Sequence, residues 1–177
     1  RDELLQVVDS NPTYCLAHYY LGMSHLSSGR TDEAIEAFKV AFEDPRFWKD
    51  LPGEPADIML QSGDYDEAIE RYRNALTHNP DYADLHCGLG VAHMARSEFE
   101  DARKELARAV EINPEYAEAH AHLGRVKAML GSEDEAIEHL ERALALKPGY
   151  ADLHRELADR YIAGERYNEA IDELARA

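Results

Sequence analysis

The sequence predicts an all-α fold, an α-solenoid of antiparallel helix pairs, and three observations support this prediction. Alanines recur every 34 residues along the chain. Each interval holds two segments whose apolar residues follow helical spacing. Glycine turns and prolines recur between these segments. A fixed period of this length indicates stacked copies of one structural unit rather than a fold built around a single centre.

Small residues and large apolar residues each recur at the same positions of the 34-residue period. One series of alanines runs through the whole chain: Ala34, Ala68, Ala102, Ala136 and Ala170. A second small series comprises Gly22, Ala56, Gly90, Gly124 and Ala158. A large apolar series comprises Phe38, Tyr72, Leu106, Leu140 and Leu174. The small residues allow two helices to approach closely, and the large residues fill the space beside them.

Each unit is expected to contain two amphipathic helices. In the third unit, Leu85 and Leu89 lie on one face of a first helix, and Leu106 lies on the matching face of a second. Pro114 ends the second helix, because its ring disfavours helical geometry in the preceding residue and removes a hydrogen-bond donor. Glycines such as Gly29 mark the turn between the two helices.

These segments resemble tetratricopeptide repeats. The resemblance rests on Leu21-Gly22, residues 29–34, Phe38, Ala41 and the later Asn79-Pro80, and it covers essentially the entire chain. It implies a right-handed solenoid in which Ala34 is the twentieth residue of its unit. The expected organisation is the end of a preceding repeat's second helix (1–12), repeat 1 (15–48), an irregular repeat 2 (49–82), repeat 3 (83–116), repeat 4 (117–150) and a truncated repeat 5 (151–177). Because both ends cut through helices, we expect a fragment of a longer array or pairing between chains.

The second repeat departs from the pattern. Pro52, Gly53 and Pro55 occupy the start of its first helix, so a helix of full length cannot form there. We expect a loop through about residues 44–54 and a short helix from Pro55 to about residue 61, because proline is tolerated in a first helical turn. This segment is either a hinge or gap that exposes Phe47 and Trp48, or a decayed helix whose aromatic side chains fill the defect.

The composition excludes two classes of partner. The chain carries 19 basic and 36 acidic side chains and a formal charge of −17. This charge repels nucleic-acid phosphates and anionic lipids, and no segment approaches the roughly 20 apolar residues of a membrane helix. We therefore expect no nucleic acid and no membrane insertion. The chain begins at Arg1 without a leader-like segment, which favours a fragment and leaves the compartment open, with the cytoplasm favoured.

Histidine and cysteine do not form a catalytic or metal-binding pattern. The recurring histidines His18, His86, His120 and His154 share one position of the repeat, so we interpret them as packing residues between the helices. Cys15 and Cys87 lie two layers apart in the expected solenoid, too far for a disulfide, and we expect free thiols. No motif of a known catalytic type occurs. We expect no metal, no cofactor and no enzymatic activity.

Aromatic residues precede each first helix: Tyr14, Trp48, Tyr82, Tyr116 and Tyr150. A tyrosine at this place can cover the end of the preceding helix while its hydroxyl reaches water or a carbonyl oxygen. The alternative is a row of exposed rings that stack on a ligand. Their repetition favours the packing role.

The resemblance also implies which positions line the concave groove of the solenoid, namely the second, fifth, sixth, ninth, twelfth and thirteenth of each unit. The candidate partner-binding residues on this basis are Tyr19, Tyr20, Met23, Asp84, Cys87, Val91, Met94, Glu118, His122, Arg125, Met129, Asp152, Arg155 and Asp159. Further groove positions are held by Leu16, Leu26, Asp50, Glu54, Asp57 and Glu156. Acids outnumber bases in this set, which favours a protein or peptide with basic and apolar side chains. The alternative is that the groove only shares the acidity of the whole chain.

Three functions fit these observations. The first is a protein-interaction scaffold or adaptor that binds a peptide or helix of a partner in its acidic and apolar groove. The second is a segment of a larger enzyme or signalling protein that selects substrates or regulates activity. The third is a scaffold that assembles with itself through the severed ends of the solenoid.

Overall fold

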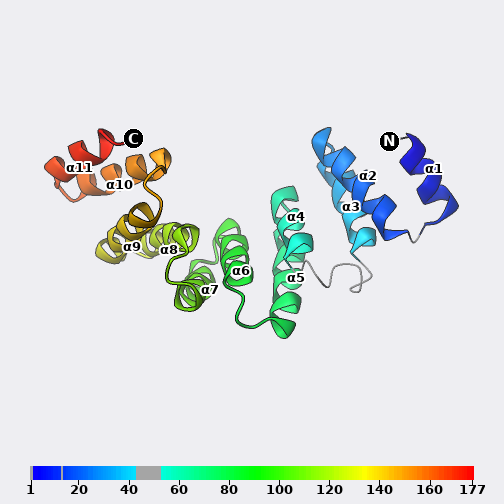
Figure 1. The fold of residues 1–177 in the computed structure, drawn as a ribbon, viewed down its shortest axis with the longest axis horizontal. Coiled ribbons are helices and arrows are strands. Elements are labelled where there is room, and N and C mark those ends of the chain that lie inside the picture. Colours follow the sequence, from blue (N-terminus) through cyan, green and yellow to red (C-terminus); the bar gives the residue numbers. More distant parts are fainter. Residues whose placement is uncertain (1, 13, 43–52) are drawn as a thin grey trace. The chain divides into compact units, whose positions relative to one another are not determined.

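The computed structural model describes residues 2–12, 14–42 and 53–177, and within these ranges the chain forms α-helices without β-strands. The predicted all-α fold is therefore confirmed. The chain divides into two compact units, Arg1–His78 and Asn79–Ala177 (Figure 1). The first unit holds α1 (Asp2–Ser10), α2 (Cys15–Ser27), α3 (Thr31–Ala41), α4 (Glu54–Ser62) and α5 (Tyr65–His78). The second unit holds α6 (Ala83–Ala95), α7 (Phe99–Ile112), α8 (Ala117–Met129), α9 (Glu133–Leu146), α10 (Ala151–Ala163) and α11 (Tyr167–Leu174).

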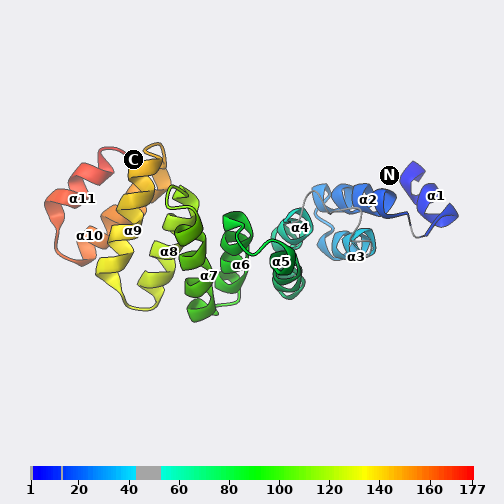
Figure 2. The ribbon, with the colours of Figure 1, turned by 60° about the horizontal axis from the view of Figure 1, so that its bottom comes forward.

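Helices that follow one another in the chain pack as hairpins. In the second unit α6 pairs with α7, α8 with α9 and α10 with α11, and α8 also packs on α7 (Figures 1 and 2). The core of this unit follows the stack as two adjoining apolar clusters. One cluster is centred on Leu106 and Leu123, and the other on Leu140 and Leu157. The core is thus a seam between helices, as the repeat predicts.

The small and large series of the repeat meet inside each hairpin. A Cβ atom added to Gly90 would lie 2.6 Å from Leu106 Cγ, and one added to Gly124 would lie 2.9 Å from Leu140 Cγ. Leu106 and Leu140 are both fully buried. The same close approach brings Gly22 against Phe38 in the first unit. The recurring glycine therefore sets the distance between the two helices of a hairpin.

The turns between paired helices use a left-handed residue. Gly29, Gly63 and Gly131 have φ angles of 70°, 83° and 81°. The corresponding turns in the other two hairpins place Ser97 and Glu165 at φ angles of 61° and 59°. Glycine adopts this conformation without the steric cost that a side chain brings.

The irregular second repeat has the short helix that the sequence predicts. Helix α4 has 9 residues, against 13 in α2, and Pro55 lies in its first turn. It begins at Glu54 rather than Pro55 and ends at Ser62, one residue beyond the expected end. The expected loop over 44–54, with Phe47 and Trp48, lies outside the described residues except for its last two positions. The choice between a hinge and a filled defect therefore stays a prediction.

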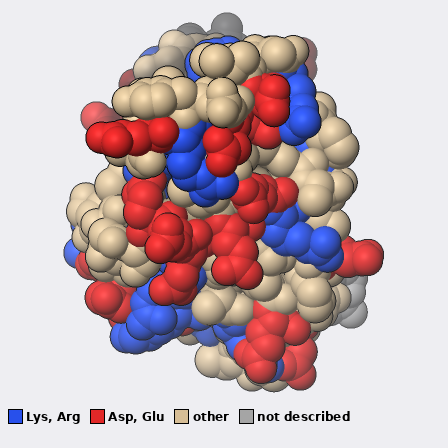
Figure 3. Space-filling view, turned by 90° about the vertical axis from the view of Figure 1, so that its left-hand side faces the viewer, with Lys and Arg blue, Asp and Glu red and all other residues tan. Residues whose placement is uncertain are grey.

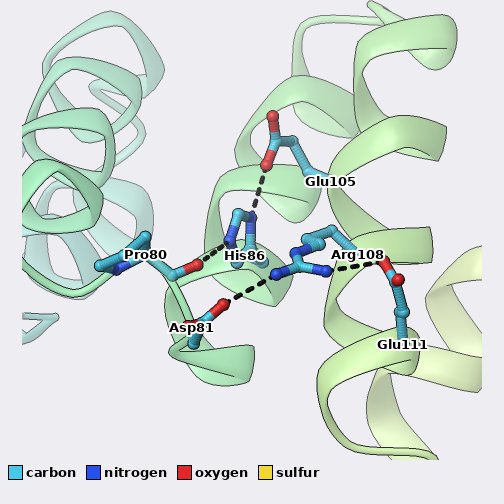
Figure 4. Close-up of polar contacts among 6 residues, drawn as sticks. All are labelled: Pro80, Asp81, His86, Glu105, Arg108 and Glu111. Atoms are coloured by element: carbon cyan, nitrogen blue, oxygen red, sulfur yellow. Dashed lines mark hydrogen bonds and ion pairs between the residues drawn. The ribbon is translucent and has the colours of Figure 1, made fainter.

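The recurring histidines form a specific contact that the sequence did not reveal. In Figure 4, His86 Nε2 donates a hydrogen bond to the Pro80 carbonyl oxygen at 3.0 Å, and His86 Nδ1 lies 2.7 Å from a Glu105 carboxylate oxygen. Arg108 beside it bridges Asp81 and Glu111 at 2.7 and 2.8 Å. The bond to proline recurs at His18 with Pro12, His120 with Pro114, and His154 with Pro148, at 2.8, 3.2 and 3.0 Å. Each of these histidines thus links the first helix of a repeat to the turn before it through a hydrogen bond.

Candidate functional site

A pocket of about 440 Å³ opens in the second unit between α8 and the start of α10. Glu118, His122 and Arg125 line it from α8, and residues 149–153 line it from the other side. The spacing of the three α8 residues places them on one face of the helix. Four of the groove residues predicted from the sequence, these three and Asp152, therefore meet in a single pocket.

Glu118 is held by the turn before α10. Lys147 Nζ and the Tyr150 hydroxyl donate hydrogen bonds to the same carboxylate oxygen of Glu118, at 2.7 and 2.6 Å. Lys147 also lies 4.7 Å from the centre of the Tyr150 ring. These two donors lower the pKa of Glu118 to about 2, so the group is ionised and its charge is offset by Lys147.

A second ion pair joins α8 to α10. Arg125 Nε donates to a Glu156 carboxylate oxygen at 2.8 Å, and both side chains are half-buried. Both residues occupy predicted groove positions. Because each charge meets an opposite charge, the acids of the pocket contribute less negative field than their number suggests.

His122 and Asp152 are the polar groups of the pocket that form no ion pair with another helix. The Nδ1 atom of His122 is buried and has no hydrogen-bond partner. Its burial, together with the nearby Arg125 charge, lowers the pKa of His122 to about 4, so the ring is neutral near pH 7. The Asp152 side chain is 93 % exposed, with Arg155 on its own helix at 3.6 Å. The pocket therefore offers one neutral imidazole and one accessible carboxylate.

Other predicted groove residues of the second unit differ in accessibility. On α6, Asp84 is exposed, Val91 and Met94 are half-buried, and Cys87 is only 5 % exposed. Met129, in the last turn of α8, is 61 % exposed. On α10, Arg155 and Asp159 are exposed but do not line the pocket. Cys87 thus packs in the core and offers little surface to a partner.

The first unit carries the aromatic part of the predicted set on α2. The rings of Tyr19 and Tyr20 meet edge to face with centres 5.4 Å apart, and Tyr20 and Met23 are 52 % and 42 % exposed. The Tyr19 hydroxyl donates to Glu54 of α4 at 3.1 Å. Burial and this carboxylate raise the pKa of Tyr19. This surface joins two predicted groove positions from neighbouring repeats.

Two of the tyrosines before the first helices, Tyr116 and Tyr150, bind acidic side chains rather than the water or carbonyl oxygen that the sequence predicts. Tyr150 bonds to Glu118, as described above, and the Tyr116 hydroxyl bonds to Asp84 and Cys87. In both cases the acid is the second residue, and the tyrosine the last residue, of the same repeat. Burial, with the nearby Cys87 and Asp84, raises the pKa of Tyr116. The regular recurrence of the tyrosines predicted a packing role. The acids that recur at the second position of the repeat could have indicated which side chains accept the hydrogen bonds of these tyrosines.

The described part of the chain shows no group of three or more metal-ligating side chains. In the same ranges, no helix combines the length and apolar character needed to span a bilayer.

Family models of the tetratricopeptide repeat match residues 59–130, 127–177 and 1–46. Among curated proteins, no sequence matches the chain. Solved structures do match: a crystal structure of MamA is 25 % identical with a TM-score of 0.70, over 88 % of this chain and 91 % of that one. Another MamA structure is 24 % identical with a TM-score of 0.73, over 92 % and 88 % of the two chains. TTC0263, a thermophilic tetratricopeptide repeat protein of Thermus thermophilus, is 28 % identical with a TM-score of 0.66, over 92 % and 89 %.

The matched ranges cover most of the chain and agree with its helix hairpins and fixed period. Repeats of this kind serve as protein-interaction scaffolds. The chain belongs to the tetratricopeptide repeat family.

Proposed function

We propose that this chain is an adaptor that binds a peptide or helix with basic and apolar side chains along its predicted groove. The observation that carries the proposal is the pocket between α8 and α10, where Glu118, His122, Arg125 and Asp152 meet. Pairing inside the pocket leaves Asp152 as its accessible carboxylate. A lysine or arginine of the partner would pair with this group, and apolar side chains would contact Met94 and Met129.

The pairing of Glu118 decides which residues test the proposal. Reversing the charge of Glu118 would place a cation beside Lys147 and disturb the joint between α8 and α10. Asp152 can be changed without breaking such a contact between helices, because its ion pair is a weak one within α10. Asp152→Lys is therefore the sharper variant, and Glu115→Lys, at an exposed acid outside the groove positions, is its control.

The test is a selection of peptides from a random displayed library against the whole chain, followed by fluorescence anisotropy on the enriched peptides. We expect enrichment of basic and apolar residues, and an affinity about 5–20-fold lower for Asp152→Lys with a flatter salt dependence. Glu115→Lys should bind like the parent chain. Enrichment of acidic peptides, or equal affinities for both variants, would exclude the proposed groove.

A further inference from the structure

One histidine pair in the second unit departs from the pattern of its neighbours. In repeat 3, His86 Nδ1 lies 2.7 Å from a Glu105 carboxylate oxygen (Figure 4). The corresponding pair in repeat 5 is also a histidine and a glutamate, at 2.5 Å. In repeat 4 the same two positions hold His120 of α8 and His139 of α9, and their Nδ1 atoms lie 3.0 Å apart. A second imidazole thus replaces the carboxylate in this hairpin.

A backbone contact holds His120 ready to act as a metal ligand. Its Nε2 atom donates a hydrogen bond to the Pro114 carbonyl oxygen at 3.2 Å, so its Nδ1 atom is unprotonated and directs a lone pair toward His139. Histidines that bind metal ions usually donate their other ring N–H to a carbonyl or carboxylate oxygen in this way. His139 is half-buried, and a neutral ring can carry its proton on Nε2, which frees its own Nδ1. Two imidazole nitrogens can therefore serve one ion.

The distance between the two nitrogens fits neighbouring ligands of one metal ion. At metal–nitrogen distances of about 2.0–2.1 Å, ligands at right angles lie about 2.9 Å apart, and tetrahedral ligands lie about 3.4 Å apart. The observed 3.0 Å is closer to the first value. Right angles are typical of tetragonal Cu²⁺ and Ni²⁺, which both accept imidazole ligands. A turn of the rings about their Cβ–Cγ bonds would direct both lone pairs at an ion beside the line that joins the nitrogens.

A hollow of about 460 Å³ beside the pair gives an ion room and access to water. Both histidines line this hollow, together with Ala145 and three charged residues of α9: Glu138, Glu141 and Arg142. The two carboxylates outnumber the guanidinium, and the nearby Lys127 is paired with Glu135. Acidic side chains also spread over the face of the second unit that Figure 3 shows, and the whole chain carries a charge of −17. This field attracts a cation.

The absence of a metal site was predicted from the spacing of histidines within single helices. His120 and His139 lie 19 residues apart on two helices, so that spacing could not reveal them. Among the described residues, no third histidine, cysteine, aspartate or glutamate completes a metal-binding group. Water must therefore fill the other positions around an ion at this pair. Such a site is open and exchanges its ion, in contrast to a closed structural centre.

We propose that His120 and His139 form an open two-histidine site for a divalent transition-metal ion of tetragonal preference, such as Cu²⁺ or Ni²⁺. The two Nδ1 atoms bind the ion, and the Pro114 carbonyl oxygen holds the His120 ring in place. The site shares no lining residue with the pocket between α8 and α10. It therefore does not depend on the peptide that the groove binds.

The test titrates the metal-free 177-residue chain with CuCl₂ at neutral pH in isothermal titration calorimetry. We expect His139→Gln to lower the affinity of the tightest Cu²⁺ site at least about tenfold, because glutamine can donate a hydrogen bond to His120 but is a poor ligand for this ion. His139→Ala removes the polar group altogether and should have the same effect. His78→Gln, at an exposed histidine of α5, is the matched control and should bind like the parent chain. Circular dichroism should show equal helix content in all four chains.

Electron paramagnetic resonance of the chain loaded with Cu²⁺ identifies the ligands. We expect a tetragonal spectrum with hyperfine coupling to two imidazole nitrogens in the parent chain, and a loss of this signal in His139→Gln. The pair of His86 and Glu105 is intact in that variant, so any binding that it retains measures the sites elsewhere. No tight Cu²⁺ site in the parent chain, an equal affinity in His139→Gln, or a spectrum without two imidazole nitrogens would each overturn the proposal. Groove peptides should bind His139→Gln as they bind the parent chain, which separates this result from the proposed function.

Discussion

His122 and the pair formed by His120 and His139 make the second unit sensitive to acid. His120 Nε2 donates to the Pro114 carbonyl, so its Nδ1 accepts a hydrogen bond from His139 Nδ1 at 3.0 Å. This arrangement requires a neutral His120 ring, because its Nδ1 atom accepts a hydrogen bond. Burial lowers the pKa of all three histidines, and the mutual repulsion of the pair adds to the effect at His139.

These directions set the sign of the pH dependence. When a folded pKa lies below the unfolded value, the unfolded chain binds more protons as the pH falls, so stability decreases below about pH 6.5. For His122, with a folded pKa of about 4, the loss between pH 7.5 and 5 amounts to about 2 kcal/mol. We expect His122→Leu to remove most of this loss, whereas His78→Leu, at an exposed histidine, should not. Urea unfolding at pH 7.5 and at pH 5 measures the loss of stability in each variant. An equal loss in the parent chain and in His122→Leu would contradict the assignment of this loss to His122.

The glycine at the centre of each hairpin gives a second prediction at this scale. Gly90→Ala places a methyl group 2.6 Å from Leu106 Cγ, so the hairpin of α6 and α7 must open. We expect a net loss of about 1–2 kcal/mol, because the better helix propensity of alanine offsets part of the overpacking. Thermal or urea unfolding measures the loss, and Gly90→Ala combined with Leu106→Val should recover part of it. No loss in the single variant would show that the helices are not held at this distance.

At the scale of elements, the joint between successive hairpins depends on the turn before each first helix. Tyr150 and Lys147 reach back to Glu118 of α8, and Arg125 of α8 reaches Glu156 of α10. These bonds join polar groups at the rim of an apolar contact. They therefore help to fix the orientation of α10 against α8 in addition to the burial of Leu153 and Leu157.

We predict that Tyr150→Phe lowers the free energy of unfolding by about 1 kcal/mol, because it removes a hydrogen bond to an ionised carboxylate and keeps the ring. A double-mutant cycle with Glu118→Gln should give a coupling energy of about 0.5–1.5 kcal/mol. Tyr167→Phe, at an exposed tyrosine of the same unit, is the control and should be neutral. Additive losses in the cycle would mean that the bond contributes nothing to the joint.

The helices and hairpins could be predicted from the sequence more completely than the polar contacts between successive hairpins. The 34-residue step placed the small and large residues, the hairpins and the short helix α4, because each depends on local spacing and on proline chemistry. The same register placed Glu118, His122 and Arg125 on one face. It did not show that Lys147 neutralises Glu118, because the corresponding residues of the neighbouring repeats are not lysine. Such pairs depend on the conformations of side chains far apart in the sequence, which periodicity does not encode.

At the scale of the whole molecule, a repeat array distributes stability from neighbour to neighbour. In the second unit, α8 packs against both α7 and α9, and it buries Leu123 and Val126 almost completely. Helix α11 packs on α10 and leaves Ile171 exposed. In such an array the free energy of local opening depends on how many neighbours a helix has.

Hydrogen exchange should therefore protect the helices of the second unit unequally. We expect the amides of α8 to exchange slowest and those of α11 fastest, with opening free energies that differ by about 2–4 kcal/mol, because α11 can open without disturbing α8. Exchange measured by mass spectrometry on the whole chain gives these values for each helix. Gly124→Ala, which forces α8 from α9, should speed exchange in both of those helices more than in α6. Equal protection of α8 and α11 would show that the unit opens only as a whole.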